Sequence, residues 1–250
     1  ENCSAPLTSH PDIDRIAFTG GTDTAKKIIQ NSSNNFAATN LELGGKSPLI
    51  IFEDADLESA ANGIIAGNFG ASGQSCVAGS RVIVHQSIAK DLLKLIQEKS
   101  QSIQVGDPLN QETNLGPLCT PRQIEIIEKT IKKSIEQGGE IIFGGKKIEG
   151  EGNYFEPTLI HCPTHNIETL KVEMFGPVIS VIKFEKEEQA IEIANDSKYA
   201  LGSGLFTKDL ARAHRVSQEI KAGICWINTY RAISPIAPFG GFNQSGYARE

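Results

Sequence analysis

Residues 41–57 read LELGGKSPLIIFEDADL, and this stretch determines the fold class. Its centre, residues 47–52 (SPLIIF), is a short apolar run of the kind that forms a strand. Asp54 and Asp56 follow at once, and their carboxylates suit the positive N-terminal end of a helix that we expect to run through Ile64. A strand followed directly by a helix is the repeating unit of an α/β protein.

The same alternation continues on both sides of this unit. Further strands are expected at residues 15–19 (RIAFT, as a buried strand), 81–85 and 178–184. Further helices are expected at residues 23–30, after Ser87 as the capping residue, from Thr120-Pro121 to Gly138-Gly139, at 187–195 and at 209–220. Two apolar stripes mark buried helix faces, formed by Ile124, Ile127, Ile131 and Ile135 and by Leu210, Ala213, Val216 and Ile220. Strands separated by helices predict a mostly parallel sheet covered by helices on both faces.

Composition limits the classes of function. The 250 residues carry a formal net charge of -6, so there is no basic surplus to bind nucleic acid or an anionic membrane. No apolar run is long enough to span a bilayer, and no basic-then-apolar leader begins the chain. Five cysteines, an odd number with no CxxC spacing, favour a reducing compartment. We therefore expect a cytoplasmic protein with neither a nucleic-acid nor a membrane partner.

Two residues are candidates for covalent chemistry. Cys76 lies in residues 67–79, a stretch crowded with Gly, Ala and Ser, where backbone can approach a ligand closely. Glu42 stands directly before two glycines, and a glutamate with apolar neighbours suits a general base. Taken alone, each motif also fits a packed thiol and a surface carboxylate. Residues 18–22 (FTGGT) likewise fit either a phosphate-binding turn or a plain tight turn.

No metal site is predicted. His161, Cys162 and His165 lie near one another in the sequence, but their spacing is loose, Pro163 interrupts it and no fourth ligand is near.

Six motifs, taken together, resemble the aldehyde dehydrogenase superfamily. They follow one another in that family's order and at its approximate spacing: FTGGT at 18–22, LELGGKSP at 41–48, GQSCVAGSR at 73–81, GDP at 106–108, EMFGPV at 173–178 and PFGGFNQSG at 238–246. The resemblance covers essentially the whole chain.

The resemblance implies a role for each matching position. Cys76 matches the nucleophile and Glu42 the general base, while Glu173 matches the carboxylate that holds the nicotinamide ribose. The other implied positions are Phe175 beside the nicotinamide, Gly20 and Gly21 at the cofactor pyrophosphate, Leu43 and Gly44 near the nicotinamide, Gln123 near the adenine ribose, and Phe239 in the aldehyde tunnel. Asn228 matches a polar position nearby, without an implied role. Most relatives have serine where Gly21 stands, so one hydroxyl contact is expected to be absent.

The implied reaction is the oxidation of a small-molecule aldehyde to a carboxylic acid with NAD or NADP. The Cys76 thiolate attacks the aldehyde and forms a thiohemiacetal, hydride transfer gives a thioester, and water activated by Glu42 hydrolyses it. Two alternatives stay open: a relative that passes the acyl group to coenzyme A, and a non-catalytic remnant or interaction module. Residues 227–250 resemble members that act on aromatic, cyclic or amine-derived aldehydes.

The resemblance also implies a division into domains. Residues 1–46 would be a remnant of a Rossmann-like cofactor domain, 47–240 the catalytic domain and 241–250 a truncated tail. The family's chain is about twice as long, so we expect most of the cofactor domain to precede residue 1 and an oligomerisation strand to follow residue 250. A homo-oligomer is expected, because such domains bury a sheet edge against a neighbour.

Overall fold

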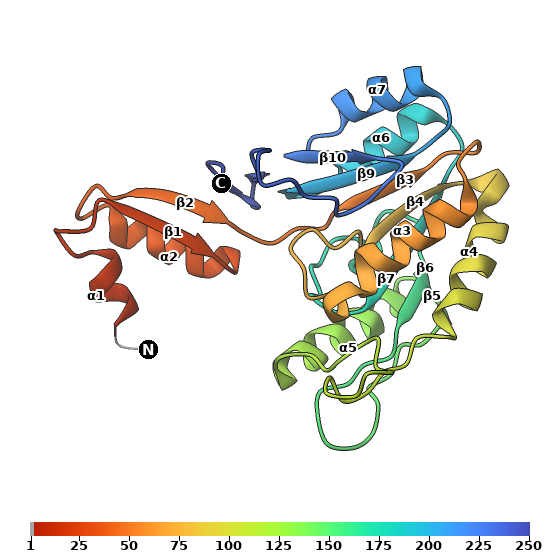
Figure 1. Cartoon of the computed structure of the whole chain (residues 1–250), viewed down its shortest axis with the longest axis horizontal. Coiled ribbons are helices and arrows are strands. Elements are labelled where there is room, and N and C mark those ends of the chain that lie inside the picture. Colours follow the sequence, from red (N-terminus) through yellow and green to blue (C-terminus); the bar gives the residue numbers. More distant parts are fainter. Residues whose placement is uncertain (1–2) are drawn as a thin grey trace.

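The large sheet confirms the expected α/β architecture. The computed structural model describes residues 3–250 and contains a seven-stranded sheet in the order β10-β9-β3-β4-β7-β6-β5 (Figure 1). Its strands are β3 (Pro48–Ile51), β4 (Arg81–His85), β5 (Glu140–Phe143), β6 (Thr158–His161), β7 (Val178–Phe184), β9 (Gly202–Phe206) and β10 (Ile224–Ile227). All neighbouring pairs are parallel except β5 with β6.

Helices cover both faces of this sheet. They are α3 (Leu57–Phe69), α4 (Gln86–Ser100), α5 (Pro121–Glu136), α6 (Glu187–Asn195) and α7 (Leu210–Glu219). Successive side chains of a strand point to opposite faces, and in β3 both faces are buried. Leu49 and Ile51 join the core beneath α3 and α4, whereas Ile50 and Phe52 join the core beneath α5, α6 and α7. None of these four side chains is more than 1% exposed, so the strand is apolar without alternation.

A second, smaller sheet lies at one end of the molecule (Figure 1). It contains β1 (Arg15–Thr19), β2 (Ala38–Glu42) and β12 (Gly246–Tyr247), with β2 parallel to β1 and antiparallel to β12. The helices α1 (Ser4–Thr8) and α2 (Thr22–Ser32) accompany it, and β8 (Tyr199–Ala200) pairs with β11 (Phe242–Asn243) nearby. Strand β2 was not expected from the sequence, because ATNLE carries few apolar residues.

Three details of the expected elements were wrong. Strand β1 alternates exposed and half-buried residues and is not buried, because α2 packs on only part of it. Ile135 and Leu210 are 47% and 71% exposed, since each stands at a helix end beyond the sheet. The cap of α4 is His85, whose ring accepts a hydrogen bond from the amide of Ser87 at 3.3 Å.

The two acidic residues after β3 have different tasks. Asp56 caps α3 by accepting a hydrogen bond from the amide of Ser59 at 2.8 Å, as expected. Asp54 does not cap this helix. It accepts hydrogen bonds from the amides of Lys208 and Asp209, at 2.8 and 3.0 Å, and so holds the start of α7. Burial acts to raise its pKa, but the hydrogen bonds from the Thr207 hydroxyl and the Lys208 amide, with the charge of Arg212, outweigh it and lower the pKa.

Within residues 3–250, no helix combines the length and the apolar character that crossing a membrane requires.

Candidate active site

The loop that carries Cys76 is tightly curled between α3 and β4. The 3-10 helix η1 (Gly70–Gly73) contains two non-glycine residues with left-handed backbone, Ala71 at φ 53° and Ser72 at φ 56°. Gly73 follows at φ 72°, and a side chain there would meet the carbonyl oxygen of Gly176 at 2.1 Å. The hydroxyl of Ser72 donates a hydrogen bond to the carbonyl of Gly116 at 2.8 Å. This fixed geometry is what one expects of a functional loop.

Cys76 lies directly against the segment that carries Glu42. A side chain on Gly45 would stand 2.2 Å from the carbonyl oxygen of Cys76, so only glycine allows the two segments to approach so closely. The thiol is half-buried. Burial raises its pKa, and the negative charge of Glu173 and, to a smaller extent, that of Glu42 add to the effect. A thiol of this kind needs a base to become a nucleophile at neutral pH.

Glu42 has the properties of such a base. It ends β2, it is only 3% exposed, and neither of its carboxylate oxygens has a hydrogen-bond partner among residues 3–250. Burial raises its pKa to about 7; the charge of Glu250 adds to the increase and that of Arg249 opposes it. A carboxylate whose pKa lies near neutrality can both accept and release a proton at physiological pH.

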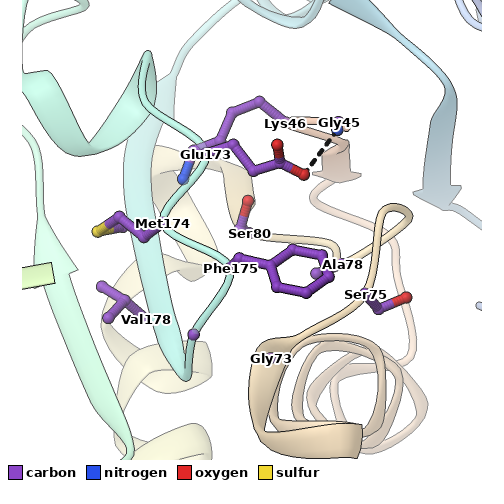
Figure 2. A pocket seen from close by; sticks show the side chains of 11 residues that line it. Gly45, Lys46, Gly73, Ser75, Ala78, Ser80, Glu173, Met174, Phe175 and Val178 are labelled. Carbon is purple, nitrogen blue, oxygen red and sulfur yellow. Dashed lines mark hydrogen bonds between the residues drawn. The ribbon is translucent and has the colours of Figure 1, made fainter. Parts of the chain in front are cut away.

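Glu173 is fixed by the glycines that follow Glu42. It comes after the 3-10 helix η2 (Glu168–Leu170), and its Oε1 accepts a hydrogen bond from the amide of Gly45 at 2.9 Å (Figure 2). A side chain on Gly44 would stand 1.9 Å from its Oε2, so this position also requires glycine. Burial is the main cause that raises the pKa of Glu173.

Phe175 and Gln123 complete this side of the site. Phe175 has left-handed backbone (φ 48°) and is 39% exposed, an unusual state for a large apolar side chain. The Gln123 side-chain amide donates a hydrogen bond to the carbonyl of Met174, and so ties the first turn of α5 to the EMFGP segment.

One pocket brings the predicted residues together. It has a volume of about 330 Å³ and is lined by Thr19, Gly20, Gly21, Glu42, Leu43, Gly44, Cys76, Gln123, Glu173 and Phe175. Every residue that the sequence assigned to catalysis or to the cofactor is therefore at this pocket, although they come from five distant segments. The structure thus brings these residues together at one pocket, and the role of each is a prediction.

Phe239, assigned to the aldehyde, does not line this pocket. It packs with a small apolar cluster formed by Val77, Leu201, Trp226, Ile224 and Tyr230, which also contacts Cys76. Cys76 thus lies between the pocket and an apolar cluster.

The cofactor side of the pocket offers features that suit a dinucleotide. Gly21 is the N-cap of α2 and has open space where a side chain would stand, so the first amides of the helix face an accessible surface. Backbone amides and the helix dipole favour a phosphate there. The Oε2 of Glu173 is available to accept a hydrogen bond from a ribose hydroxyl. These residues fit a nicotinamide dinucleotide.

The other residues singled out in the sequence, Asn228 and the pair His161 and Cys162, make contacts that support the fold. The side chain of Asn228 accepts a hydrogen bond from the amide of Thr207 and donates one to its carbonyl, both at 2.9 Å, and so latches β10 to β9. His161 faces Glu140 at 3.4 Å, and the Cys162 thiol is buried. Among residues 3–250, no group of three or more His, Cys, Asp or Glu side chains is arranged to hold a metal.

Sequence reasoning missed two groups at the site. Glu250 acts on Glu42 through its charge, but nothing in the sequence pairs residues 208 positions apart (250 − 42). Lys46 ends the ELGGK motif and is 2% exposed, whereas a lysine at a strand entrance is ordinarily solvated.

Comparison with known proteins agrees with this geometry. The model of the aldehyde dehydrogenase family matches residues 1–250. A (Z)-2-((N-methylformamido)methylene)-5-hydroxybutyrolactone dehydrogenase of Acinetobacter baylyi is 49% identical over 249 residues, which are 99% of this chain and 51% of that protein. A betaine aldehyde dehydrogenase of Rhizobium leguminosarum is 40% identical over 247 residues, or 98% of this chain and 51% of that protein.

Solved structures give the same result. PnpE of Pseudomonas sp. WBC-3 has the same fold, and its complex with nicotinamide adenine dinucleotide superposes with a TM-score of 0.95 at 43% identity, covering 98% of this chain and 51% of that one. The betaine aldehyde dehydrogenase of Staphylococcus aureus in complex with NAD+ has a TM-score of 0.94 at 37% identity, covering 98% of this chain and 50% of that one. The chain therefore spans about half the length of these relatives.

Proposed function

The chain belongs to the aldehyde dehydrogenase family, and on that premise we propose that it carries the catalytic centre for NAD(P)-dependent oxidation of an aldehyde to a carboxylic acid. One observation supports this most: Cys76, Glu42 and Glu173 line one pocket together with the glycines at the start of α2. That pocket combines a nucleophile, a base and a place for a dinucleotide.

In the first step, Cys76 would attack the aldehyde. Its pKa is raised by burial, so the thiol proton must leave, and Glu42, directly or through a water, is the nearby carboxylate that can take it. The sulfur then bonds to the carbonyl carbon, the C=O π electrons move to oxygen, and a thiohemiacetal oxyanion results. The backbone amide of Cys76 can donate a hydrogen bond to this oxyanion.

In the second half of the reaction, Glu42 would activate water. A bound nicotinamide cofactor supplies the acceptor for the hydride that leaves the thiohemiacetal carbon. Glu42 first passes the proton that it took from the thiol to solvent. It then accepts a proton from water as the water oxygen attacks the resulting thioester, and the tetrahedral intermediate collapses with cleavage of the C–S bond to release the carboxylic acid and the Cys76 thiolate. Because its pKa is about 7 and its oxygens have no other partner within the described chain, Glu42 suits this task.

The cofactor would lie along the pocket from α2 to Phe175. Gly20 and Gly21 would approach its pyrophosphate, Leu43 and Gly44 the nicotinamide, Glu173 a ribose and Phe175 the nicotinamide face. Gln123 would approach the adenine ribose, but its side-chain amide already donates a hydrogen bond to the carbonyl of Met174. Relatives that bind NAD+ in solved structures favour NAD over NADP.

The apolar cluster beside Cys76 favours an aldehyde with an apolar or aromatic body. Trp226 and Tyr230 contact each other edge to face, with ring centroids 4.8 Å apart, and Phe239 packs with them. The relatives named for a hydroxybutyrolactone and for betaine aldehyde suggest cyclic and amine-derived aldehydes as further candidates.

A coenzyme A-acylating enzyme and a non-catalytic remnant are the alternatives. The unpartnered carboxylate of Glu42 disfavours the first, because transfer to coenzyme A requires no activated water. We also propose that residues 1–46, 47–240 and 241–250 are separate functional regions and that the whole protein is a homo-oligomer.

The test is cofactor reduction by the purified chain with NAD or NADP and a panel of aldehydes. Cys76→Ala should abolish turnover, while Cys225→Ala, which removes another half-buried thiol with a raised pKa, should keep it. Equal turnover in both variants would refute the proposal. If the chain alone does not turn over, covalent labelling by an aldehyde-like electrophile that requires Cys76 and not Cys225 supports a competent nucleophile. Absence of such labelling supports a remnant.

A further inference from the structure

Lys46 is a buried charge that the proposed mechanism does not use. Its side chain is 2% exposed, and its Nζ has no hydrogen-bond partner anywhere in residues 3–250. Its backbone is held firmly, because its carbonyl accepts a hydrogen bond from the Nε of Arg81 at 2.7 Å. An ammonium removed from water without a hydrogen-bond partner is costly, so it keeps its proton only where a nearby negative charge opposes the effect of burial.

The Lys46 side chain enters a small cavity beside the main pocket. Figure 2 shows it running alongside Glu173, and the cavity has a volume of about 10 Å³. Its lining includes Gly45, Ser80, Glu173, Met174, Phe175 and Val178. Glu173 and Phe175 line both this cavity and the main pocket, so Glu173 lies between Lys46 and the candidate cofactor site.

The charges around Lys46 and Glu173 point to one pairing. Burial and the positive charge of Arg81 lower the pKa of Lys46 to about 7, and Glu173 and, less strongly, the Cys162 thiol oppose this. Around Glu173, burial raises the pKa, while the Gly45 amide, Lys46 and then Lys198 lower it. Two other titratable groups respond to Glu173, namely Cys76 and Tyr199, whose pKa values its charge raises.

Lys46 and Lys198 differ in one respect that matters. Lys198 is exposed, so water and salt screen its charge, whereas Lys46 is buried and its field is screened much less. The buried lysine is therefore the effective counter-charge of Glu173, although the two side chains form no direct hydrogen bond.

We propose that Lys46 is a positioning residue whose buried positive charge keeps Glu173 ionised and turned toward Gly45. In this state, the free oxygen of Glu173 is ready to accept a hydrogen bond from a ribose hydroxyl. The last clause rests on the proposed function, whereas the coupling between Lys46 and Glu173 does not.

The direct test is the titration of Glu173, followed by NMR through its carboxyl carbon and assigned with Glu173→Gln. In Lys46→Met the midpoint should move up by about one pH unit or more, the size expected when a close opposite charge is lost. Lys198→Met is the matched control and should move it much less. An unchanged midpoint in Lys46→Met, or an equal shift in both variants, would overturn the proposal.

A second measurement protects against a folding defect. Because coupling between two sites is reciprocal, Glu173→Gln should lower the midpoint of the Lys46 ammonium by the same amount, measured by NMR at its Cε. If Lys46→Met does not fold, this reading decides alone, and an unchanged Lys46 midpoint contradicts the proposal.

Cofactor binding separates this proposal from the proposed function. If the chain binds NAD in calorimetry, Lys46→Met should weaken binding at neutral pH about tenfold, with affinity recovering as pH rises and Glu173 ionises again. Loss of affinity that is the same at every pH would mean that Lys46 only supports the fold. If wild-type chain binds no NAD but the two titrations shift as expected, the coupling stands and the cofactor assignment falls.

Discussion

The regions built on the two sheets of this molecule both contribute to the site, but the two sheets differ greatly in packing. In β3 of the large sheet, both faces are buried beneath helices, and residues 49–51 are fully buried. In β1 of the small sheet, no residue is fully buried. Nevertheless, the small sheet supplies Glu42 and the Gly20-Gly21 turn, while the large domain supplies Cys76 and Glu173.

The region that supplies the candidate base is much less densely packed than the region that supplies Cys76. Cys76, the proposed nucleophile, lies on a loop anchored in a dense core, whereas Glu42, the proposed base, lies at the end of a strand with a small core. Elements with few buried apolar contacts open more readily than densely packed ones. The backbone of β2 is therefore held mainly by pairing with β1 and β12, while the carboxylate of Glu42 itself makes no hydrogen bond within residues 3–250.

The largest expected effect tests whether the small sheet truly contributes chemistry. Glu42→Gln keeps the shape of the side chain but removes the base, so steady-state turnover should fall roughly a thousandfold, within the range for general acid–base catalysis. If Glu42 acts mainly on water, a single burst of reduced cofactor per Cys76 should remain, because acylation precedes hydrolysis. Stopped-flow absorbance distinguishes this from a complete loss. Unaltered turnover would show that the carboxylate of β2 takes no part.

The second prediction compares the packing of the two sheets directly. Ile50→Ala removes a fully buried side chain from the large core and should lower the free energy of unfolding by about 4 kcal/mol. Ile16→Ala, at a half-buried position of β1, should cost only about 1 kcal/mol, because little apolar surface returns to water. Urea unfolding measures both. Equal losses would mean that the small sheet is packed as tightly as the large one.

The same contrast explains what could be predicted from the sequence. Residues 47–52 lie within a dense core, and a dense core requires an apolar pattern that periodicity reveals. Strand β2 is held by pairing to β1 and β12, and hydrogen bonds between backbones leave no such pattern. The sequence predicted β3, β4 and β7 of the large sheet, whose apolar runs are continuous, and missed β5, β6, β9 and β10. Strand β9 is fully buried, but its sequence GSGLF has no such run. The strand that ends in the candidate base was missed as well.

The site shows a similar division. The glycines of ELGGK are visible as a motif, and the structure gives a reason for both: a side chain on Gly44 would collide with Glu173, and one on Gly45 with Cys76. The counter-charges are not visible, because Lys46 and Glu250 affect their partners across long sequence separations. A local sequence pattern can show where the backbone requires glycine. The charged partners of a group can be identified only once the fold is known.

The third prediction concerns a contact between the segment after β2 of the small sheet and β8, which precedes β9 of the large sheet. Ser245 is fully buried, and its hydroxyl donates a hydrogen bond to the carbonyl of Gly44 at 2.7 Å and accepts one from the amide of Ala200 at 3.0 Å. Ser245→Ala leaves both groups unpaired and should cost about 2 kcal/mol. Thermal unfolding measures the loss. Ser203→Ala, at an equally buried hydroxyl within the large sheet that bonds only to Ile224, is the control.

The hydrogen bonds of Ser245 should also affect the position of Glu42. If Ser245 positions the segment after Glu42, Ser245→Ala should reduce turnover, while Ser203→Ala should not. A loss of stability without any loss of turnover would show that the Gly44 carbonyl does not need this contact for the geometry of the site.

The smallest effect is a shift of the pH profile. Glu42 acts as a base when it is ionised, so the rate should rise with pH through its pKa of about 7. The charge of Glu250 raises that pKa, so Glu250→Gln should lower it and move the rising limb to lower pH, by about half a pH unit for a screened charge. Arg249→Met removes the opposing charge and should move the limb to higher pH. If both variants move it in the same direction, the pKa of Glu42 is governed by its burial against the large domain and not by the two charges at the end of the chain.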